Sequence, residues 1–598
     1  MMAAFWLLLM AGAAHGYGVA IARALRLPLP TRLERAVLTI GLGAALLVVA
    51  TFALGVLHLL GPRSALLLIL PAVGFGAWRV ATSASATRVS SSRSWMHLGL
   101  LLALVVCVAA NLVGTLAPPS FIDALFYHLF IARTYARAGG IVELPYIWQS
   151  YQPLGVEMLF TLGFCLHGAV LAALIHAGLG VLAACATYLL GRRTAGAVGG
   201  LFAAAIFYCT AMTAWESTSC FVELGIAAFG TIGFYAVLRW TDDEDPRWLV
   251  AAALLMGAAG TCKLTAIQLP LIAAGLTGWV SWRKRRGFSV IVRRVAVFMG
   301  ISLAFCLPWY LHSYLWTENP VYPFAAGIFG DNPDYRDVWL ILSHYGPGHG
   351  FRNLLLAPWH LLSNGAAFEA GQHLSPLPFV FAPLILVRLK SALDQQLLAT
   401  AAAFIFLLWL ASAHIARYLI TVQPLLTVLA AEAACWFAAT SRYRLRLVVL
   451  TGALFVGFGT VSTLLVFRTL APVVFGRESV EAYLTRTAPF YVAYRMAMAD
   501  VPENGLILTN QGATFYLDRP HVRVRDAEFF AGPQRISQLL AQRPFTHVLV
   551  HGQPGMEALV MALGPRVKLL WHRDVEMSVS RTLGITSRLP AALFEVIR

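Results

Sequence analysis

Apolar residues occur in long runs along most of this chain, and short polar loops separate the runs. A helix needs about 20 mainly apolar residues to cross a bilayer. The pattern predicts about 14 spans of this kind, near residues 3–22, 36–60, 64–78, 98–117, 170–190, 196–214, 219–239, 247–261, 264–282, 292–314, 376–389, 397–412, 417–438 and 447–468. We therefore expect an α-helical polytopic membrane protein.

The apolar stretch 153–190 can be interpreted in two ways, as two short spans or as an interfacial helix followed by one span. Arg192 and Arg193 follow it, and Arg and Lys are enriched in cytoplasmic loops. A single crossing places both arginines in the cytoplasm. We therefore favour an interfacial helix near 153–166 and a span near 170–190.

The basic residues of the other loops fit the same alternation. The loops predicted to be cytoplasmic contain Arg23, Arg26, Arg32 and Arg35; Arg79, Arg88 and Arg93; Arg283, Lys284, Arg285 and Arg286; Arg388 and Lys390; and Arg442, Arg444 and Arg446. Both chain ends, and the loops that alternate with the cytoplasmic ones, are then expected outside. The first external loop follows the span near 98–117.

Composition supports a membrane protein and argues against a nucleic-acid partner. Of the 598 residues, 59% are hydrophobic and 12% are charged, and mean hydropathy is +0.72. The net charge of +16 would suit nucleic acid only if Arg and Lys clustered on one soluble face, whereas here they lie between apolar segments. The eight cysteines lie in or beside apolar stretches without a CxxC pair, as expected of small buried residues.

The chain divides into three parts by this pattern. Residues 1–97 contain the first three predicted spans, and residues 98–469 contain the other spans, with external loops at 118–152 and 316–375. Residues 470–598 are expected to form a small external α/β domain, because buried strands are predicted near 505–509, 546–550 and 567–571, with helices near 532–542 and 555–563.

Polar residues gather at the external ends of widely separated spans. They are Asp123, Tyr127 and His128 in the first loop, Glu223 near a turn that also contains Trp215 and Glu216, Lys263, Asn319 and Tyr322, and His414, Arg417 and Tyr418. Ionisable residues at membrane depth are costly, which makes them candidates for function. If such residues were distributed at random, about half of them would lie at cytoplasmic span ends, so their gathering on one side is informative.

Plainer explanations exist for each residue taken alone. Lys263 and Arg417 could extend to the lipid headgroups, and Glu223 could be a polar contact between helices. Asn319 and Tyr322 could serve a turn around two prolines. Asp123 could cap the helix that follows Pro118 and Pro119.

Together these residues favour chemistry on a lipid-linked phosphate. Cations at span ends can hold a phosphate whose lipid tail stays in the bilayer, and a phosphate neutralised by Lys and Arg is a better leaving group. A nearby carboxylate can take the proton of an attacking hydroxyl as general base. Sugar transfer from a polyprenyl carrier combines these features.

Several segments, in order from about residue 100 to 520, resemble the GT-C type membrane glycosyltransferases. The first-loop segment Pro118-Pro-Ser-Phe-Ile-Asp123 with Tyr127-His128 is similar to theirs, as is Tyr151-Gln-Pro-Leu-Gly-Val-Glu157. So are Gly260-Thr-Cys-Lys263-Leu-Thr-Ala266, Glu318-Asn-Pro-Val-Tyr-Pro-Phe324, Arg417-Tyr-Leu419 and Phe475-Gly-Arg-Glu-Ser-Val-Glu-Ala-Tyr-Leu484. The set resembles the bacterial branch that uses polyprenyl-phosphate sugars, related to the protein mannosyltransferase and aminoarabinose transferase group.

The resemblance implies that residues 1–97 are additional N-terminal spans beside a GT-C type transmembrane core at 98–469. It also implies a role for each candidate. Asp123 corresponds to the first-loop aspartate, a base or acceptor-binding acid, and Glu223 stands where many members have a second acid, usually Asp. The carrier phosphate would be held by Lys263, Arg417 and His414, with Tyr418 also in the binding set; the pocket would be shaped by Tyr127, His128, Asn319 and Tyr322. Some relatives use a divalent cation and others none, so the metal ligands stay open.

We therefore expect a glycosyltransferase of a bacterial inner or cytoplasmic membrane, with its site and C-terminal domain external. It would move a hexose or pentose, with inversion, from a polyprenyl-phosphate carrier to a hydroxyl acceptor. One alternative is a transporter or flippase of lipid-linked sugars, which would favour internal repeats and broken helices at the bilayer midplane. Another is a non-catalytic subunit that binds a partner through the tail.

Overall fold

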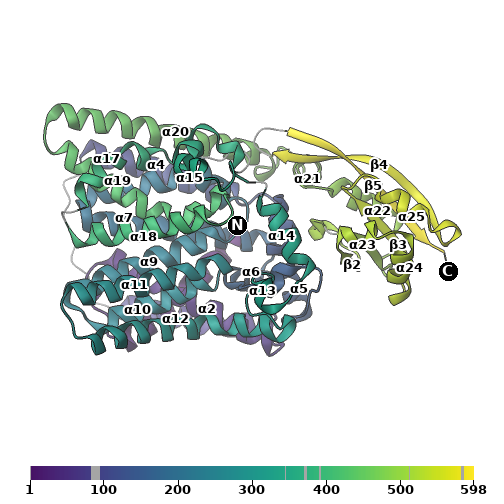
Figure 1. Cartoon of the computed structure of the whole chain (residues 1–598), viewed down its shortest axis with the longest axis horizontal. Helices are drawn as coiled ribbons and strands as arrows, with labels where there is room; N and C mark the ends of the chain where they lie inside the picture. The colour runs from purple at the N-terminus through teal and green to yellow at the C-terminus, as the bar shows by residue number, and fades with distance from the viewer. Residues whose placement is uncertain are drawn as a thin grey trace. The chain divides into compact units, whose positions relative to one another are not determined.

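The computed structural model describes residues 2–82, 94–343, 345–368, 374–389, 392–510, 512–580 and 585–597 (Figure 1). Ten helices among these residues are long and apolar enough to cross a bilayer: α1 (Met2–Ala24), α2 (Arg32–Val56), α3 (Pro62–Thr82), α4 (Trp95–Gly114), α7 (Ala169–Tyr208), α9 (Glu223–Asp243), the segment Leu264–Arg283 that contains α11 (Gln268–Arg283), α12 (Phe288–Thr317), α18 (Leu393–Leu410) and α20 (Arg442–Val474). The chain is thus an integral multi-pass membrane protein.

Shorter helices complete the set. Three are apolar: α6 (Gly155–Leu166), α10 (Pro246–Gly260) and α19 (Gln423–Ala438). The others are α5 (Leu129–Ala138), α8 (Ala211–Ser217), α13 (Ala326–Phe329), α14 (Pro333–Ser343), α15 (Phe351–Ser363), α16 (Leu377–Val380), α17 (Ala382–Arg388), α21 (Val480–Thr487), α22 (Tyr491–Asp500), α23 (Asp526–Phe530), α24 (Pro533–Gln542) and α25 (Met556–Met561).

Most of the predicted spans correspond to the ten long helices, whereas those near 247–261 and 417–438 correspond to the shorter helices α10 and α19. Two other regions also differ from the prediction. Helix α7 contains the 170–190 span and the 196–214 span as far as Tyr208, and Gly196, where the two meet, has a non-helical backbone (φ 74°, ψ −176°). The span predicted at 376–389 is two short helices, α16 and α17, where prolines remove backbone donors. Arg88, Arg93 and Lys390, used for the topology, lie outside the described residues.

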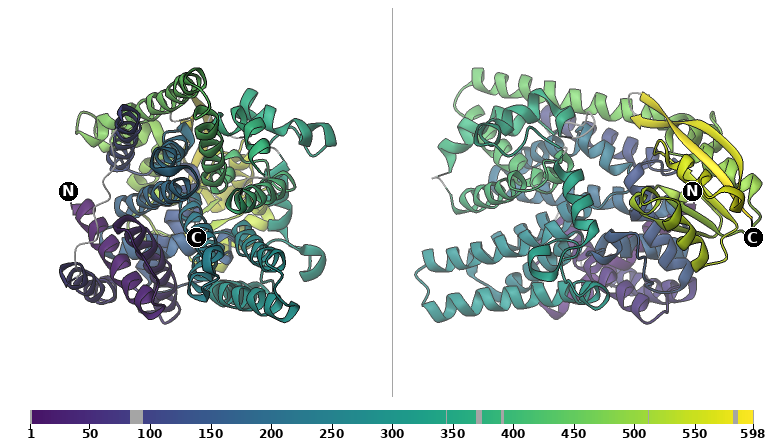
Figure 2. Two further views of the ribbon diagram at one scale, coloured as in Figure 1. Left: turned by 90° about the vertical axis from the view of Figure 1, so that its left-hand side faces the viewer. Right: turned by 45° about the vertical axis from the view of Figure 1, so that its right-hand side comes forward.

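The chain folds into two compact units. The first comprises Met1–Leu116, Ala132–Val142 and Ser150–Arg468, and the second comprises Ala117–Ile131, Glu143–Gln149 and Thr469–Arg598. Most long helices of the first unit run along a common direction, so several are seen end-on in Figure 2. The helices α9, α10, α11 and α12 lie side by side (Figure 1).

Glycines allow the N-terminal helices to pack closely. A Cβ added at Gly18 in α1 would lie 1.7 Å from the Thr39 carbonyl oxygen in α2, and one added at Gly43 in α2 would lie 1.7 Å from the Ala14 carbonyl oxygen. Small residues at such positions let helix backbones approach in membranes, where dispersion forces favour association.

An ion-pair cluster joins two of the loops predicted to be cytoplasmic. The Glu244 carboxylate lies 3.5 Å from Lys284 Nζ, 2.6 Å from an Arg286 nitrogen and 2.6 Å from an Arg294 nitrogen. Hydrogen bonds from the Arg286 guanidinium, above all, lower the pKa of Glu244 to about 2. The end of α9 is thereby tied to the connection between α11 and α12.

The second unit contains a five-stranded sheet in the order β2-β1-β3-β5-β4. The strands are β1 (Ile507–Asn510), β2 (His521–Val524), β3 (His547–His551), β4 (Val567–Ser580) and β5 (Ile585–Val596). Strand β1 is parallel to β2 and β3, whereas β5 is antiparallel to β3 and β4. Strands β1, β3 and β4 match the three predicted strands, and β2 and β5 were not predicted.

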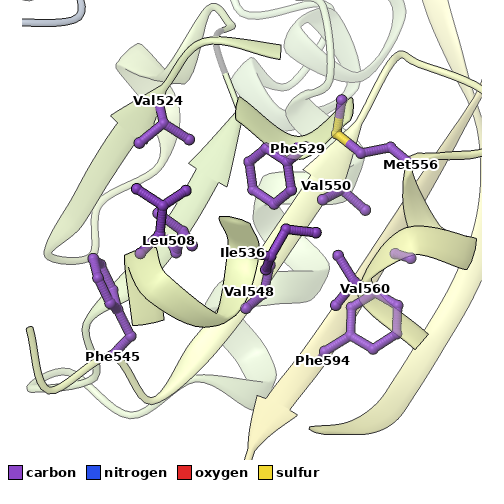
Figure 3. Close-up of a cluster of buried hydrophobic side chains, with 12 residues drawn as sticks. Leu508, Val524, Phe529, Ile536, Phe545, Val548, Val550, Met556, Val560 and Phe594 are labelled. Atoms are coloured by element: carbon purple, nitrogen blue, oxygen red, sulfur yellow. The ribbon is translucent and has the colours of Figure 1, made fainter. Parts of the chain in front are cut away.

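Each face of the sheet packs against helices. On one face, β-strand residues such as Leu508, Val548 and Phe594 pack with side chains of α23, α24 and α25 (Figure 3). On the other face, Ile507 and Leu549 pack against α22. Helices α24 and α25 fall where helices were predicted, and the result is the small C-terminal α/β domain that was expected.

Two pieces of the chain near the predicted loop 118–152 fold with this domain. Ala117–Ile131, which contains Asp123, and Glu143–Gln149 belong to the second unit, although the sequence associates them with the transmembrane core, and Ala132–Val142 belongs to the first. The unit is therefore discontinuous along the chain.

Candidate functional site

A cavity of about 180 Å³ in the first unit contains the best-supported group of candidate residues. Helix α9, the 3-10 turn at Leu264–Ile267, α11, the end of α18 and the 3-10 turn at Ala416–Thr421 contribute to its walls. Its lining residues are Glu223, Ile226, Lys263, Thr265, Ala266, Gln268, Leu269, Ile405, Leu408, Trp409, Ser412, Tyr418 and Thr421. Three predicted site residues, Glu223, Lys263 and Tyr418, thus share one cavity.

Lys263 pairs with Glu223 across the cavity wall. Lys263 Nζ lies 2.7 Å from Glu223 Oε1, and the two side chains are 17% and 2% exposed. The backbone N–H of Val222 donates to Glu223 Oε2 at 3.1 Å. Glu223 is also in the first turn of α9, where the helix dipole favours a negative charge.

Tyr418 and Arg417 complete the cationic side of this group. Lys263 Nζ lies 3.7 Å from the centre of the Tyr418 ring, a cation–π contact. Arg417 Nε lies 3.9 Å from Glu223 Oε1, and its guanidinium lies 4.4 Å from the Phe221 ring centre. Two cations therefore lie beside the buried Glu223 carboxylate.

Asn319 and Tyr322 organise a loop in the first unit. Asn319 accepts a hydrogen bond from Val321 N–H (2.9 Å) and donates one to the Phe324 carbonyl (2.8 Å). The Tyr322 hydroxyl donates to Asp334, and the Tyr322 ring packs against Tyr151. The Asn319 side chain makes the turn contacts that its place beside two prolines predicts, and neither residue lines the cavity described above.

His414 lies in a separate aromatic cluster. Its ring centre is 4.5 Å from that of His349 and 5.4 Å from that of Trp409, and its Nε2 is 3.0 Å from the Leu410 carbonyl oxygen. His414 does not line the cavity, although Trp409 belongs to both groups. Burial, above all, lowers its pKa, so the ring is expected to be neutral near pH 7.

Asp123, Tyr127 and His128 lie together in the second unit. Asp123 precedes a single turn of π-helix, η1 (Ala124–His128), a conformation that often occurs at functional sites. Within the part of the chain that the structure describes, the Asp123 side chain makes no capping hydrogen bond to η1. The Tyr127 and His128 rings are 4.0 Å apart between centres.

Several polar residues in and beyond the cavity were not predicted from the sequence. Gln268 and Thr265 line the cavity, and their spacing after Lys263 on the chain could have indicated this. Inside the helices, His176 Nε2 lies 3.9 Å from Glu216 Oε2, and both side chains are fully buried. His176 is in the middle of an apolar run, where no pattern distinguishes it from a helix-packing residue.

The sequence does not decide whether the protein binds a divalent cation. Among the described residues, the structure brings together no group of three or more His, Cys, Asp or Glu side chains that could hold a metal ion. The cavity in the first unit instead combines one carboxylate with cationic and aromatic groups.

Comparison with protein-family models finds no match, and no curated protein sequence matches the chain either. Solved structures do match. ArnT from Cupriavidus metallidurans bound to undecaprenyl phosphate matches with a TM-score of 0.54 and 16% identity, covering 84% of this chain and 98% of that chain. Its apo state matches with a TM-score of 0.53 and 17% identity over the same shares.

A weaker similarity, with a TM-score of 0.48 and 13% identity, is to the Archaeoglobus fulgidus oligosaccharyltransferase in complex with Zn and sulfate. It covers 75% of this chain and 67% of that chain. The similarity to ArnT, at such low identity, concerns the fold alone. It confirms the predicted fold class: the chain has the polytopic helical fold of the GT-C type, with a small C-terminal α/β domain.

Proposed function

We propose that this protein transfers a sugar from a polyprenyl-phosphate carrier to a hydroxyl acceptor at the external face of the membrane. The observation that carries the proposal is the cavity in which Lys263 faces both the buried Glu223 carboxylate and the Tyr418 ring.

The charges around the cavity favour a phosphate. Lys263 and Arg417 are two cations beside the Glu223 carboxylate. Both could bind a phosphate at this place. Charge-assisted hydrogen bonds from Lys263 would also stabilise the negative charge that develops on the carrier phosphate as the sugar leaves.

The apolar side of the cavity suits a lipid carrier. Ile226, Leu269, Ile405 and Leu408 line it together with Trp409. A ligand with a phosphate head and a hydrocarbon tail matches a wall that changes from cationic to apolar. Because ArnT is described bound to undecaprenyl phosphate, this lipid is the natural probe.

Asp123 is the general base of the chemical step in this proposal. It would take the proton of the acceptor hydroxyl as that oxygen forms the new bond to the anomeric carbon, while the bond from that carbon to the carrier phosphate breaks. The products are the glycosylated acceptor and the free polyprenyl phosphate, and direct displacement inverts the anomeric centre. Tyr127 and His128 would shape the acceptor side, with Glu223 holding Lys263 in place.

The remaining candidates have supporting roles. Asn319 and Tyr322 would fix the loop that begins at Glu318, since their hydrogen bonds lie within it and to Asp334. His414 would support the end of α18 near Trp409. The orientation, with this face external, follows from the basic loops on the other side.

The test uses the purified chain in liposomes with undecaprenyl phosphates that carry a radiolabelled hexose or pentose, and a bacterial envelope extract as the source of acceptor. Label transferred to an acceptor, with release of undecaprenyl phosphate, is the expected result. Movement of the labelled lipid across the bilayer without transfer would instead indicate a flippase. Neither transfer nor movement would indicate a non-catalytic subunit.

A further inference from the structure

Three side chains of the C-terminal domain bind the segment that contains Asp123. The Tyr516 hydroxyl donates a hydrogen bond to the Pro119 carbonyl (2.6 Å), and the Tyr483 hydroxyl lies 3.2 Å from Ser120 Oγ. Arg523 Nη1 donates to the Phe126 carbonyl at 3.0 Å. These contacts lie on both sides of Asp123 along the chain.

Arg523 makes the most extensive of these contacts. It is 5% exposed, and its guanidinium lies 5.1 Å from the Phe126 ring centre and 4.2 Å from that of Phe130. The same Nη1 donates to the Gly512 carbonyl at 2.7 Å. Burying a guanidinium is costly unless its hydrogen bonds are satisfied, so this residue requires a partner segment in one fixed conformation.

The π-helical turn η1 follows Asp123, contains five residues and runs directly into α5. Such turns are rare and short. The hydrogen bonds from Tyr516 to the Pro119 carbonyl and from Arg523 to the Phe126 carbonyl hold the backbone before and after Asp123. Loss of either bond is therefore expected to loosen the backbone beside Asp123.

We propose that the C-terminal domain positions Asp123, with Tyr516 and Arg523 as the positioning residues. The inference rests on the proposed function, because it assigns the domain to the chemical step through the base. A base displaced by about 1 Å can lose much of its effect. The domain is then a working part of the site, whatever else it binds.

The direct test is hydrogen exchange on the full chain in nanodiscs, which needs no assay of activity. Tyr516→Phe removes one hydroxyl with little change of shape, and Arg523→Lys keeps the charge but loses the forked geometry. Tyr494→Phe is the matched control, because the Tyr494 hydroxyl belongs to the same domain and lies 3.4 Å from His551 Nε2.

Exchange of amides in 121–131 is expected to be at least about 5-fold faster in Tyr516→Phe and in Arg523→Lys, and unchanged in Tyr494→Phe. Unchanged exchange in Tyr516→Phe would overturn the inference even if Arg523→Lys does not fold. Equal acceleration in the Tyr494→Phe control would also overturn it, because the effect would then be general loosening of the domain.

Kinetics separate a positioning role from a structural one. With saturating lipid donor, kcat of Tyr516→Phe is expected to fall about 10-fold, while KM for the donor stays within about 2-fold. Faster exchange with wild-type kcat would overturn the positioning role and leave the proposed function intact. Wild-type transfer by Asp123→Asn would instead overturn the proposed base, and with it the positioning role.

Discussion

At the scale of single residues, the first unit balances a buried acid against more than one cation. Glu223 is 2% exposed and is held by Lys263 and the Val222 backbone N–H. A carboxylate buried in this way is costly without such partners. The pair is thus a stable arrangement in itself, and an anionic ligand has to compete for Lys263.

Replacing Asp123 tests the base. Asp123→Asn keeps the shape but cannot accept a proton, so we expect kcat for sugar transfer to fall by about 100-fold or more. Binding of undecaprenyl phosphate is expected to change little. Asp518→Asn, an exposed acid of the C-terminal domain, serves as the control and is expected to transfer at the wild-type rate.

Replacing Lys263 tests the phosphate site. Lys263→Gln is expected to weaken binding of undecaprenyl phosphate about 10- to 100-fold, because a charge-assisted contact is lost. Lys568→Gln, in β4 of the second unit, is the control for loss of one lysine.

Stability and binding can be separated at the same pair. Lys263→Gln leaves Glu223 with less compensation, so thermal stability also falls. The double variant Lys263→Gln with Glu223→Gln has no charge at either position. It should recover thermal stability but not the affinity for undecaprenyl phosphate. Wild-type affinity in Lys263→Gln would show that the phosphate binds elsewhere.

The sequence was informative for residues at helix ends and less so for residues in loops. Glu223 lies at the start of α9, Lys263 just after α10, and Tyr418 in the 3-10 turn before α19, and all three line one cavity. The spacing of the apolar runs predicts where these helices end, so the three residues could be grouped from the sequence. The contacts of Asn319 and His414 depend on the conformation of long loops, which the sequence does not predict. The sequence could not decide between a turn and a pocket for Asn319, since both uses favour the same residue.

At the scale of elements, apolar length predicted most helices, and local backbone chemistry explains the exceptions. Gly196 ends one helix and allows another to start, so α7 is not continuous. In the C-terminal domain, β5 was missed because it contains Pro590, and proline is unusual inside a sheet. Strand β2 was missed because His521 and Arg523 alternate with its two valines, so it lacks the consecutive apolar residues that mark β1 and β3.

Helix packing near the N-terminus gives a prediction at this scale. Gly43→Ala would place a Cβ 1.7 Å from the Ala14 carbonyl oxygen, so α1 and α2 must move apart. We expect a loss of about 1–3 kcal/mol in unfolding free energy, measured as a lower Tm in detergent. A Cβ added at Gly74 in α3 would meet no atom within 4 Å, so Gly74→Ala should be neutral or slightly stabilising. Equal effects of both would contradict the packing described.

At the scale of the whole molecule, the chain builds its second unit from segments that are far apart in sequence. Ala117–Ile131 and Glu143–Gln149 fold with Thr469–Arg598. Apolar periodicity carries no information on such pairing, because the contacts use single side chains such as Tyr516 and Arg523. The α/β character of the tail could be predicted, whereas its partner segment could not.

The stability of the second unit should depend on pH through His551. Burial above all, with Arg523 nearby, lowers the pKa of His551 to about 3 from its ordinary value near 6.5. The folded state therefore favours the neutral ring. Stability is fully present above about pH 6.5 and falls as the pH drops toward 3, by about 2 kcal/mol at pH 5.

Pulse proteolysis in urea between pH 7.5 and 5 measures this effect on the full chain. His551→Gln should remove much of the pH dependence. The exposed His572→Gln should retain it. A pH dependence unchanged in His551→Gln would assign the effect to another group.

The cavity beside Lys263 is proposed to hold the carrier phosphate. A structure of the full chain with bound undecaprenyl phosphate would locate that phosphate. We predict it within hydrogen-bonding distance of Lys263 Nζ, close to Arg417, with the lipid along Ile226, Leu269 and Leu408. A phosphate bound away from both Lys263 and Arg417 would contradict the proposed site.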